Sequence, residues 1–409
     1  IYSILHEDPQ PITSKRKDVP IGLEDIIEKA LAKEPDKRYA TMDELLAELE
    51  TQRDHITLGI KERRFTAMRK FRRRKRLGAL IGALVVIAVG VMLMQVFKTP
   101  SVGIDSIAVL PFSNLSGDEE QEYFADGMTE SLINEISQIG ALRVVSRTSV
   151  MQFKKTEKSL QEIARALKVD AVVEASALRT GDRVQVTAKL IKIDPEKVLW
   201  SESYNREEKA AAVLPSEVAR AIADRIQVAL TPEEAERLTR VRAVSSKAHD
   251  AYLKGRYYSY EWTEEGMRKG AEYYREAIEI DPTYGLPYAG LADYYITSSL
   301  FGFIAQGVAM PKARAAAKKS LELDPSQGAV HAFLGWIKFD YDWNWHGPDA
   351  DFRRAIELNP SDPNARIWYV QYLTYVGEFD EAIAQSKRAI QIDPLTYSTA
   401  LQLPWVYEY

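Results

Sequence analysis

A long apolar stretch of the chain runs from Leu77 to Phe97 and contains no charged residue. Its twenty-one residues, at about 1.5 Å rise each, span roughly 30 Å, the thickness of the hydrocarbon core of a bilayer. A buried helix of a folded domain would not need the basic block that precedes this stretch, which has ten Lys or Arg within residues 61–76. The pattern predicts a transmembrane helix over 77–97, preceded by a basic juxtamembrane segment over 51–76.

The charges on either side of this segment predict its orientation. Only Lys98 follows it closely before acidic residues begin at Asp105, so the amino-terminal side is expected in the cytoplasm. Residues after Pro100 are expected in the periplasm, in a single-pass protein of the plasma (inner) membrane. The basic segment is expected to bind anionic membrane lipids rather than nucleic acid. Gly78 and Gly82 form a Gly-x-x-x-Gly pair that predicts a homodimer, with lipid-facing glycines as the alternative.

Two short helices are expected between residues 22 and 49. Apolar residues recur there at helical spacing on both sides of Pro35, at Ile26, Ile27, Ala30, Leu31, Met42, Leu45, Leu46 and Leu49. Two short apolar stripes bury too little surface to fold alone, so this part is expected to complete a larger domain upstream. The chain starts at Ile1 without a methionine and is expected to be a segment of a longer protein.

Ile4–Pro9, Leu23–Leu31 and Lys33–Tyr39 resemble the carboxy-terminal end of bacterial serine/threonine protein kinase domains. The resemblance implies that Arg38 pairs with the glutamate of an Ala-Pro-Glu motif, which this chain lacks. A solvent-facing arginine after a turn is the alternative for Arg38. The resemblance also implies ATP and magnesium as cofactors of the parent protein. The Gly-rich loop, the ATP lysine and the His-Arg-Asp and Asp-Phe-Gly motifs are missing, so residues 1–50 cannot transfer a phosphoryl group themselves.

From Ser106 onward the pattern predicts alternating strands and helices. The expected strands are 106–112, 142–146, 171–178, 183–194 and 198–204, and the expected helices are 122–139, 160–167 and 214–230. The strands on either side of Thr180-Gly181-Asp182 are expected to form a hairpin, whose return strand places on one face Val184, Val186, Ala188 and Leu190. The sum is an α/β sandwich over 104–231, with helices packed on one mixed sheet.

Several segments of this region look like the amino-terminal domain of TolB and its relatives, namely Ile107–Ser116, Tyr123–Thr129, Arg147–Ser149 and Leu199–Glu202. The resemblance implies an interaction module without known chemistry. Asp126, Glu130 and Arg147 are accompanied by no nucleophile, metal-ligand set or phosphate loop. We therefore expect these three residues to be helix caps and surface charges rather than an acid-base set.

One helix ending recurs four times after Ser245, at Ala277–Pro282, Ser320–Pro325, Ala355–Pro360 and Ala389–Pro394. The four prolines are separated by 43, 35 and 34 residues, against the roughly 34-residue period of tetratricopeptide repeats. Residues 246–409 look like this family, which implies an all-α solenoid with a concave surface for an extended peptide or a partner helix. The extra residues of the longer repeat are expected in the loop around 301–308.

Three aromatic residues in the turn of the third repeat, Tyr341, Trp343 and Trp345, are candidates for anchoring a partner. Flat aromatic rings bury much area at little entropic cost, which suits such a role. Packing between neighbouring repeats is the alternative that we favour.

Composition excludes several kinds of site. The 409 residues are 46% hydrophobic and 28% charged, as in ordinary folded domains. There is no cysteine, and the five histidines are scattered without ligand spacing. We therefore expect no disulfide, no structural zinc and no catalytic, cofactor-binding or metal-ligating residue within this chain.

The predicted fold class is thus multidomain: an α-helical kinase tail, one transmembrane helix, a TolB-like α/β sandwich and an all-α repeat solenoid. This order favours the sensory and anchoring portion of a transmembrane serine/threonine protein kinase, whose external domains bind protein or peptide partners. A membrane-bound transcription activator with the same external domains is the alternative, and a non-catalytic repeat scaffold is a further one. Motifs upstream of Ile1 distinguish a kinase from a DNA-binding protein.

Overall fold

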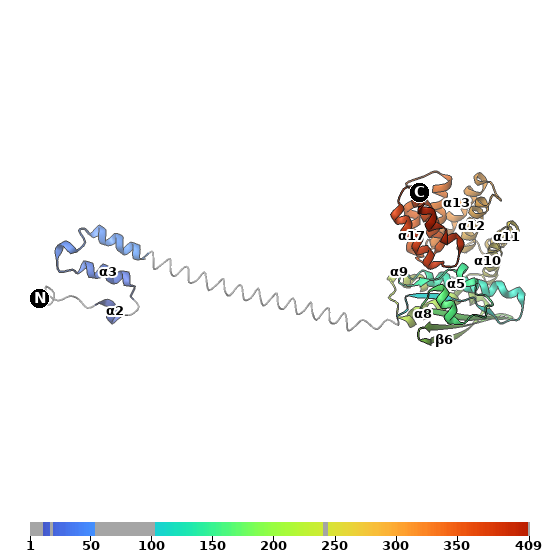
Figure 1. Ribbon diagram of the computed structural model, residues 1–409, viewed down its shortest axis with the longest axis horizontal. Helices are drawn as coiled ribbons and strands as arrows, with labels where there is room; N and C mark the ends of the chain where they lie inside the picture. Colours follow the sequence, from blue (N-terminus) through green and yellow to red (C-terminus); the bar gives the residue numbers. More distant parts are fainter. Residues whose placement is uncertain (1–10, 17–18, 54–102, 240–243, 408–409) are drawn as a thin grey trace. The chain divides into compact units, whose positions relative to one another are not determined.

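The computed structural model describes residues 11–16, 19–53, 103–239 and 244–407. The chain divides into two compact units, Ile1–Thr99 and Pro100–Tyr409, which are described separately below (Figure 1).

The described part of the first unit is helical. It contains α2 (Ile12–Lys15), α3 (Ile21–Ala30), the 3-10 turn η1 (Pro35–Lys37) and a helix over residues 42–53. Glu24 ties α2 to α3 because its carboxylate accepts hydrogen bonds from Thr13 N at 3.0 Å and Thr13 Oγ1 at 2.8 Å. Ile26 is the one buried hydrophobic side chain among the described residues of this unit, and Met42 is exposed. These helices therefore share very little core.

No helix in the described ranges combines the length and the apolar character needed to cross a membrane. The longest of them, α13 (Gln306–Leu323), carries five charged residues. The predicted span 77–97, with Gly78 and Gly82, lies outside the described residues. The expectation of a single-pass inner-membrane protein with periplasmic domains is therefore not supported, and the predicted fold class is wrong on this point. The structure shows a mostly helical chain with a small sheet domain and a solenoid of tetratricopeptide-like repeats.

The sheet domain is built on one mixed sheet. Its strands are β1 (Ser106–Val109), β2 (Ser113–Asn114), β3 (Arg143–Val144), β4 (Ala171–Thr180), β5 (Arg183–Ile193) and β6 (Glu196–Glu207). Their order is β3-β1-β4-β5-β6, with β2 beside β4. The β1 strand runs parallel to β3 and β4, whereas β4, β5 and β6 are antiparallel. The β4–β5 turn needs Gly181, whose φ is +60°, a value that favours glycine.

The helices of this domain are α5 (Glu122–Ser137), α6 (Arg147–Met151), α7 (Leu160–Leu167), α8 (Leu214–Ile226) and α9 (Pro232–Thr239). Helices α5, α7 and α8 pack on the sheet, whereas α6 contacts α5 and α9 contacts α8. Two 3-10 segments, η2 (Glu119–Gln121) and η3 (Glu208–Val213), precede α5 and α8. The face of β5 that the alternation predicts is fully buried, with no exposure at Val184, Val186, Ala188 and Leu190. Helix α5 contacts β1, β3, β4 and α8, so its outer side is the one left for a neighbour.

The second half of this unit is a stack of helix pairs (Figure 1). Its helices are α10 (Ser246–Ser259), α11 (Glu264–Ile280), α12 (Gly285–Leu300), α13 (Gln306–Leu323), α14 (Gly328–Trp336), α15 (Pro348–Leu358), α16 (Pro363–Tyr375), α17 (Phe379–Ile392), α18 (Tyr397–Ala400) and α19 (Gln402–Tyr407). A π-helical turn, η4 (Ile337–Tyr341), extends α14. Helices α10, α12, α14 and α16 contact one another in succession and form the inner row of the array.

The recurrent helix endings place the boundaries of the repeats. The residue before the recurring proline in three of them, Asp281, Asp324 and Asn359, leaves the helix in an extended or related conformation, because the residue before proline disfavours the α region. Gly377 closes α16 with φ +84°, which an L-side chain rarely adopts. The extra residues of the longer repeat extend α13 to 18 residues, so they do not lie mainly in the loop expected around 301–308.

Candidate functional site between the sheet domain and the inner repeat helices

A cavity of about 400 Å³ lies between α5 and the inner row of the repeat array. One wall is the outer side of α5, which includes Glu130 and Glu135. The opposite wall comes from α10, α12 and α16 and from the start of α14. Its volume is in the range of small-molecule sites, and inner helices are the elements that solenoids use for recognition. We refer to this space as the central cavity.

The first repeat is fixed to the sheet domain at one side of the central cavity. Asp250 on α10 accepts hydrogen bonds from Tyr123 Oη at 2.6 Å and from Arg179 on β4 at 2.8 Å. Gly127 permits close approach of α5 to α10, because a Cβ at this position would lie 2.7 Å from a methyl carbon of Leu253. One hydrophobic core therefore runs from the sheet into the first repeat.

The last described repeat returns to the same domain. Asp393, at the end of α17, is 4% exposed and accepts hydrogen bonds from Ser149 Oγ at 2.7 Å and from Ser146 Oγ. The backbone continues this contact, because Ser146 N donates to Ile392 O at 2.9 Å. Arg143 donates to the carbonyl oxygen of Gln391 at 2.7 Å. The array thus contacts the sheet domain at both of its ends, and the central cavity lies between these contacts.

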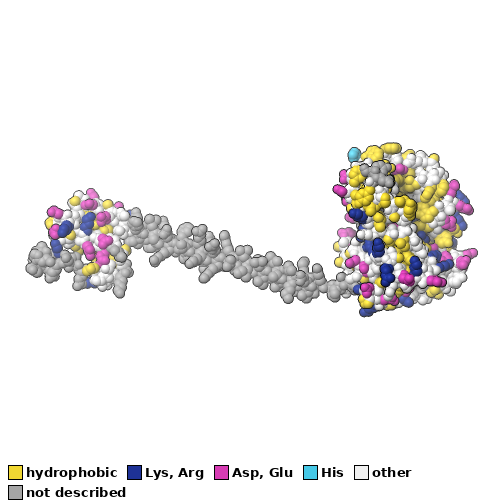
Figure 2. Space-filling model, in the orientation of Figure 1, with side chains coloured by type: hydrophobic (Ala, Val, Ile, Leu, Met, Phe, Trp, Pro, Cys, Tyr) yellow, Lys and Arg dark blue, Asp and Glu magenta, His cyan; other side chains and the backbone are white. Residues whose placement is uncertain are grey.

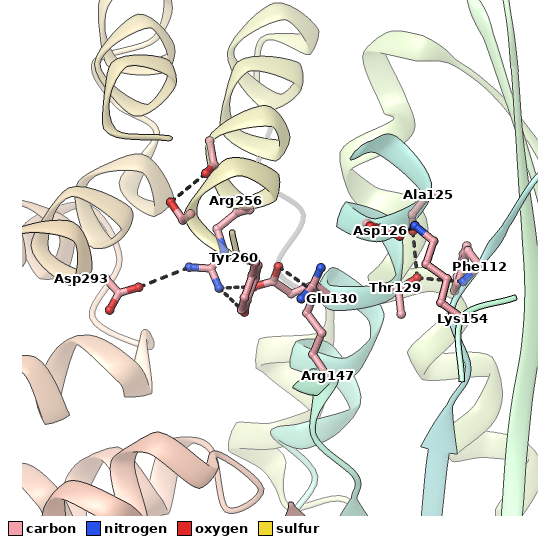
Figure 3. A network of polar contacts seen from close by, with 12 residues as sticks. Phe112, Ala125, Asp126, Thr129, Glu130, Arg147, Lys154, Arg256, Tyr260 and Asp293 are labelled. Atoms are coloured by element: carbon pink, nitrogen blue, oxygen red, sulfur yellow. Dashed lines mark hydrogen bonds and ion pairs between the residues drawn. The ribbon is translucent and has the colours of Figure 1, made fainter. Parts of the chain in front are cut away.

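A network of charges crosses the central cavity at α5 (Figure 3). Glu130 is 6% exposed and accepts hydrogen bonds from Arg256 of α10 and, at 3.2 Å, from Tyr260 Oη. Arg147, at the start of α6, lies 3.7 Å from the same carboxylate and stacks on the Tyr260 ring at 3.7 Å. Arg256 also lies 3.8 Å from Asp293 on α12. One buried carboxylate thus holds two guanidinium groups, one from each side of the cavity.

This network corrects one sequence expectation. Asp126 and Glu130 are one turn apart on α5, and both are buried rather than surface charges. Asp126 pairs with Lys154 at 2.6 Å, whereas Glu130 pairs across the junction. The sequence did contain a signal for this burial. Apolar residues surround these two carboxylates on the same helix, at Phe124, Ala125 and Met128, so the helix has little polar face on which to expose them.

Five buried nitrogen atoms on residues that line the central cavity have no hydrogen-bond partner. They are Nε of Arg147, Arg237 and Arg256, Nε2 of Gln327 and Nε2 of His249. The first four are donors, and the imidazole nitrogen donates or accepts according to the tautomer. Buried polar groups are normally paired, so this junction is less completely hydrogen-bonded than an ordinary core.

Burial perturbs titration around the central cavity. Loss of hydration lowers the pKa of His249 to about 4, so the imidazole is neutral at pH 7. Burial raises the pKa of Glu135 to about 7, and nearby Asp324 adds to this rise. Burial also raises the pKa of Asp293 above its ordinary value. Perturbed groups in an enclosed space are typical of functional sites.

The site residues predicted from the sequence lie elsewhere. Arg38 is exposed and donates from Nε to Ala32 O at 2.7 Å, and its predicted glutamate partner is not in this chain. Tyr341 packs partly against the repeat core, whereas Trp343 is 71% exposed and meets the edge of Trp345 at 6.3 Å. Figure 2 shows hydrophobic side chains gathered over the repeat array. A partner-anchoring role for the three aromatic residues stays a prediction.

Metal chemistry has no candidate within the described ranges, where no group of three or more His, Cys, Asp or Glu side chains is arranged to hold an ion. The arrangement of arginines, carboxylates and aromatic rings around the central cavity is suited to binding.

Comparison with known proteins connects the sheet domain to transcription regulators. Residues 103–224 match the family model for the second domain of HilA/YgeH-like transcriptional regulators. The transcriptional regulator HilA of Salmonella typhimurium (strain LT2) is 20% identical over 306 residues, which cover 74% of this chain and 54% of HilA. Putative adenylate cyclase 3 of Rhizobium meliloti (strain 1021) is 31% identical over 286 residues, 68% of this chain and 41% of that protein. The chain spans about half the length of these curated relatives, or less.

Two solved structures resemble part of the chain. YrrB, a TPR protein with an unusual peptide-binding site, is 21% identical with a TM-score of 0.28, over 39% of this chain and 77% of YrrB. A thermophilic TPR protein of Thermus thermophilus is 15% identical with a TM-score of 0.34, over 48% of this chain and 93% of that protein.

These findings correct the kinase prediction. The matched proteins are a transcriptional regulator and a putative cyclase, so the expected kinase and transferase character is wrong, whereas ATP and magnesium as cofactors of the parent protein stay a prediction. That expectation depended on about fifty residues without any catalytic motif. The family model that matches this region is that of the transcription regulators, and it does not support the expected TolB-like domain. The chain is a tetratricopeptide-like repeat protein that carries a domain similar to the second domain of HilA/YgeH-like transcriptional regulators.

Proposed function

We propose that this chain is the regulatory part of a transcription regulator, in which the sheet domain and the repeats together bind a protein or peptide partner. The observation that carries the proposal is the match of residues 103–224 to the second domain of HilA/YgeH-like regulators. The similarity to HilA covers 74% of this chain and so extends well beyond the matched domain.

The junction supports a regulatory rather than a purely structural role. The inner helices of a solenoid ordinarily face solvent and bind extended peptides or helices. Here α5 of the sheet domain faces that inner row, with Glu130 and Arg256 joined across the central cavity. A partner that occupies the inner row must change this contact, and such a change can be passed to whatever is attached to the sheet domain.

The test uses the full-length protein that contains this chain, tagged at its chromosomal locus. Chromatin immunoprecipitation is expected to recover a limited set of promoter fragments, and deletion of the gene is expected to change transcripts from the same promoters. Arg256→Met in the full-length protein is expected to change those transcripts when wild type and variant are compared at equal protein level. Absence of promoter enrichment together with unchanged transcripts would contradict the proposal.

A second candidate function is the regulatory part of a nucleotide cyclase. The specific observation in its favour is the 31% identity to putative adenylate cyclase 3 over 68% of this chain. Cyclic AMP measured in strains that lack or overproduce the full-length protein distinguishes the two candidates. A changed cyclic AMP level without promoter enrichment would favour the cyclase, and no change in either readout would favour a non-catalytic repeat scaffold.

A further inference from the structure

The turns inside the four helix pairs of the repeat array carry exposed aromatic side chains. One or two lie in or beside each turn, and they are Trp262, Phe301, Phe303, Trp343, Trp345 and Tyr375. We refer to these six residues as the aromatic row. Even Phe303, the least exposed of the six, is 38% exposed, so the fold leaves a large part of every ring open to solvent.

Contacts between neighbouring turns make the aromatic row continuous along the array. The first turn meets the second through two rings, the second meets the third through a hydrogen bond, and the third meets the fourth through a buried ring. These contacts are Trp262 with Phe301 at 6.1 Å between ring centroids, Gln306 Nε2 with Asp340 at 2.7 Å, and Phe339 at 5.5 Å from both Trp345 and Tyr375. The exposed rings therefore form one surface, which is typical of an interaction site.

This surface lies at a different edge of the array from the one that contacts the sheet domain. Ser361 and Asp393, which bond to the sheet domain, precede α16 and follow α17. Tyr375 lies at the opposite end of the same two helices. These helices have 13 and 14 residues, so about 20 Å separates the two edges there.

Two tryptophans of the aromatic row occupy backbone positions that favour glycine. Each of the four turns has one residue with positive φ, which is Gly302 in the second and Gly377 in the fourth, at +75° and +84°. In the first and third turns it is Trp262 and Trp343, both at +55°. Bulky residues are strained in this region. Both side chains are more than half exposed, so packing gives little compensation, and strain retained in this way is typical of functional positions.

The same turns are strongly acidic. Ten Asp or Glu and no Lys or Arg occur in the turns and the helix starts after them, at residues 261–265, 301–308, 340–351 and 376–381. Three of these carboxylates pair with Lys or Arg from outside these ranges. In contrast, Glu264, Glu265, Glu378 and Asp380 are exposed and form no ion pair with another described residue. Charge complementarity therefore favours a basic partner and disfavours nucleic acid or an anionic bilayer.

We propose that the aromatic row binds a basic amphipathic helix of a partner protein, with its apolar stripe on the rings and its Lys or Arg residues toward the unpaired carboxylates. Neighbouring inner helices pack about 8–10 Å apart, so the row is about 24–30 Å long, the length of a helix of about 16–20 residues. Apolar residues seven apart on such a helix are separated by about 10 Å, which places one at each repeat. The inference rests on the proposed function for its role, since it names the class of partner that the regulator binds.

The test measures binding of synthetic peptides to the purified full chain by fluorescence anisotropy. The probe is a labelled peptide of about 20 residues that contains only Leu and Lys, with Leu on one face of the helix. One control peptide has Glu in place of every Lys, and another has the same residues in an order without helical periodicity. The basic amphipathic peptide is expected to bind at least tenfold more tightly than either control, and about 0.5 M salt is expected to weaken its binding by screening.

Two double variants test the rings and the carboxylates separately. Trp262→Gly with Trp343→Gly is expected to weaken binding at least tenfold, because exposed aromatic anchors are lost. Its melting temperature is expected to stay the same or rise, because glycine adopts the left-handed backbone freely. Glu378→Lys with Asp380→Lys is expected to weaken binding of the basic peptide about tenfold by repulsion.

The sheet domain offers matched controls for both changes. Glu119 and Glu120 are neighbouring exposed carboxylates at the start of a helical turn, so Glu119→Lys with Glu120→Lys makes the same change of charge elsewhere. Leu115 is 59% exposed, and Leu115→Gln removes an apolar side chain outside the row. Both controls are expected to change the affinity less than twofold.

Several results would overturn the proposal. Equal affinity for the basic and acidic peptides would show that charge does not select the partner. Lost binding together with a lower melting temperature in the tryptophan variant would show that these residues stabilise their turns. Absence of peptide binding would also overturn it: a dimer that this variant dissociates would then assign the row to a second copy, and binding to neutral vesicles that the variant abolishes would assign it to a membrane. None of these readouts involves promoters, so this surface and the proposed function can fail independently.

Discussion

Glu130 is the residue on which the junction between sheet domain and repeats should depend most. Its carboxylate is buried and is the shared partner of Arg256, Tyr260 and Arg147. Glu130→Gln keeps the size of the side chain and removes the charge, so two guanidinium groups lose their counterion in a site of low hydration. Removing one partner of a buried pair costs about 3–5 kcal/mol, because the other charge is left uncompensated.

A matched control exists on the surface of the same domain. Glu217 pairs with Arg206 at 2.9 Å, but both side chains are about a third or more exposed to solvent. Surface pairs contribute about 0–1 kcal/mol because water screens them and replaces lost bonds. Glu217→Gln should therefore leave the free energy of unfolding almost unchanged.

Urea unfolding followed by tryptophan fluorescence provides the assay, since the chain has seven tryptophans. The loss at Glu130 should move the midpoint to lower urea by about 1 M, given the steep denaturant dependence of a chain of this size. The double variant Glu130→Gln with Arg256→Met should recover part of the loss, because it removes one of the stranded charges. If Glu130→Gln cost no more than Glu217→Gln, the network would not hold the junction, and the reasoning would be refuted.

Three further predictions concern packing, attachment and pH. Gly270→Ala places a Cβ 2.8 Å from the carbonyl oxygen of Gly255 and should lower the free energy of unfolding by about 1–3 kcal/mol. The control Gly307→Ala has no atom within 4 Å of its new Cβ and should be neutral or slightly stabilising. Equal melting temperatures of the two variants would contradict this prediction. Asp393→Ala removes a buried carboxylate that accepts hydrogen bonds from several hydroxyl groups, and it should lower the free energy of unfolding by about 3 kcal/mol. Amide hydrogen exchange in α18 and α19 should become faster, and unchanged exchange there would count against this prediction. Burial raises the pKa of Glu135 to about 7, so between about pH 4.5 and 7 the folded chain binds more protons at this residue than the unfolded chain does. The contribution of Glu135 to the free energy of unfolding is therefore lost as pH rises through that window. Glu135→Gln should therefore raise the melting temperature at pH 8 and not at pH 4. The gain at pH 8 should correspond to about 1–2 kcal/mol in the free energy of unfolding, once screening by solvent is included. The same gain at both pH values would refute this prediction.

Several elements could be predicted closely because their causes are local. Helix α7 begins and ends where the pattern places it, since Ser159 and Glu162 form a reciprocal capping box before a strongly amphipathic segment. The β4–β5 hairpin follows from Gly181 in its turn. The repeats follow from the recurrent helix endings, which mark the same point of each helix pair.

Other predictions had only a local basis, and the findings do not support them. The apolar run 77–97 and the kinase-like motifs near Arg38 are short stretches taken without their partners. The described structure contains no helix able to cross a membrane, and the matched proteins are not kinases. Hydropathy of one segment and resemblance over about fifty residues were too little to determine localisation or enzyme class.

By itself the sequence determined most elements of the sheet domain and the helix endings of the solenoid, because helical and strand periods, caps and turns act over a few residues. The short elements β2, α6 and α9 were not predicted. The tertiary structure alone decided how these two parts meet. Glu130 and Arg256 are 126 residues apart, and Ser146 and Asp393 are 247 apart. No periodicity along the chain encodes such pairs. They depend on the curvature of the whole repeat array, which brings its last helices back into contact with the sheet domain. The central cavity exists only because that array contacts the sheet domain at both ends.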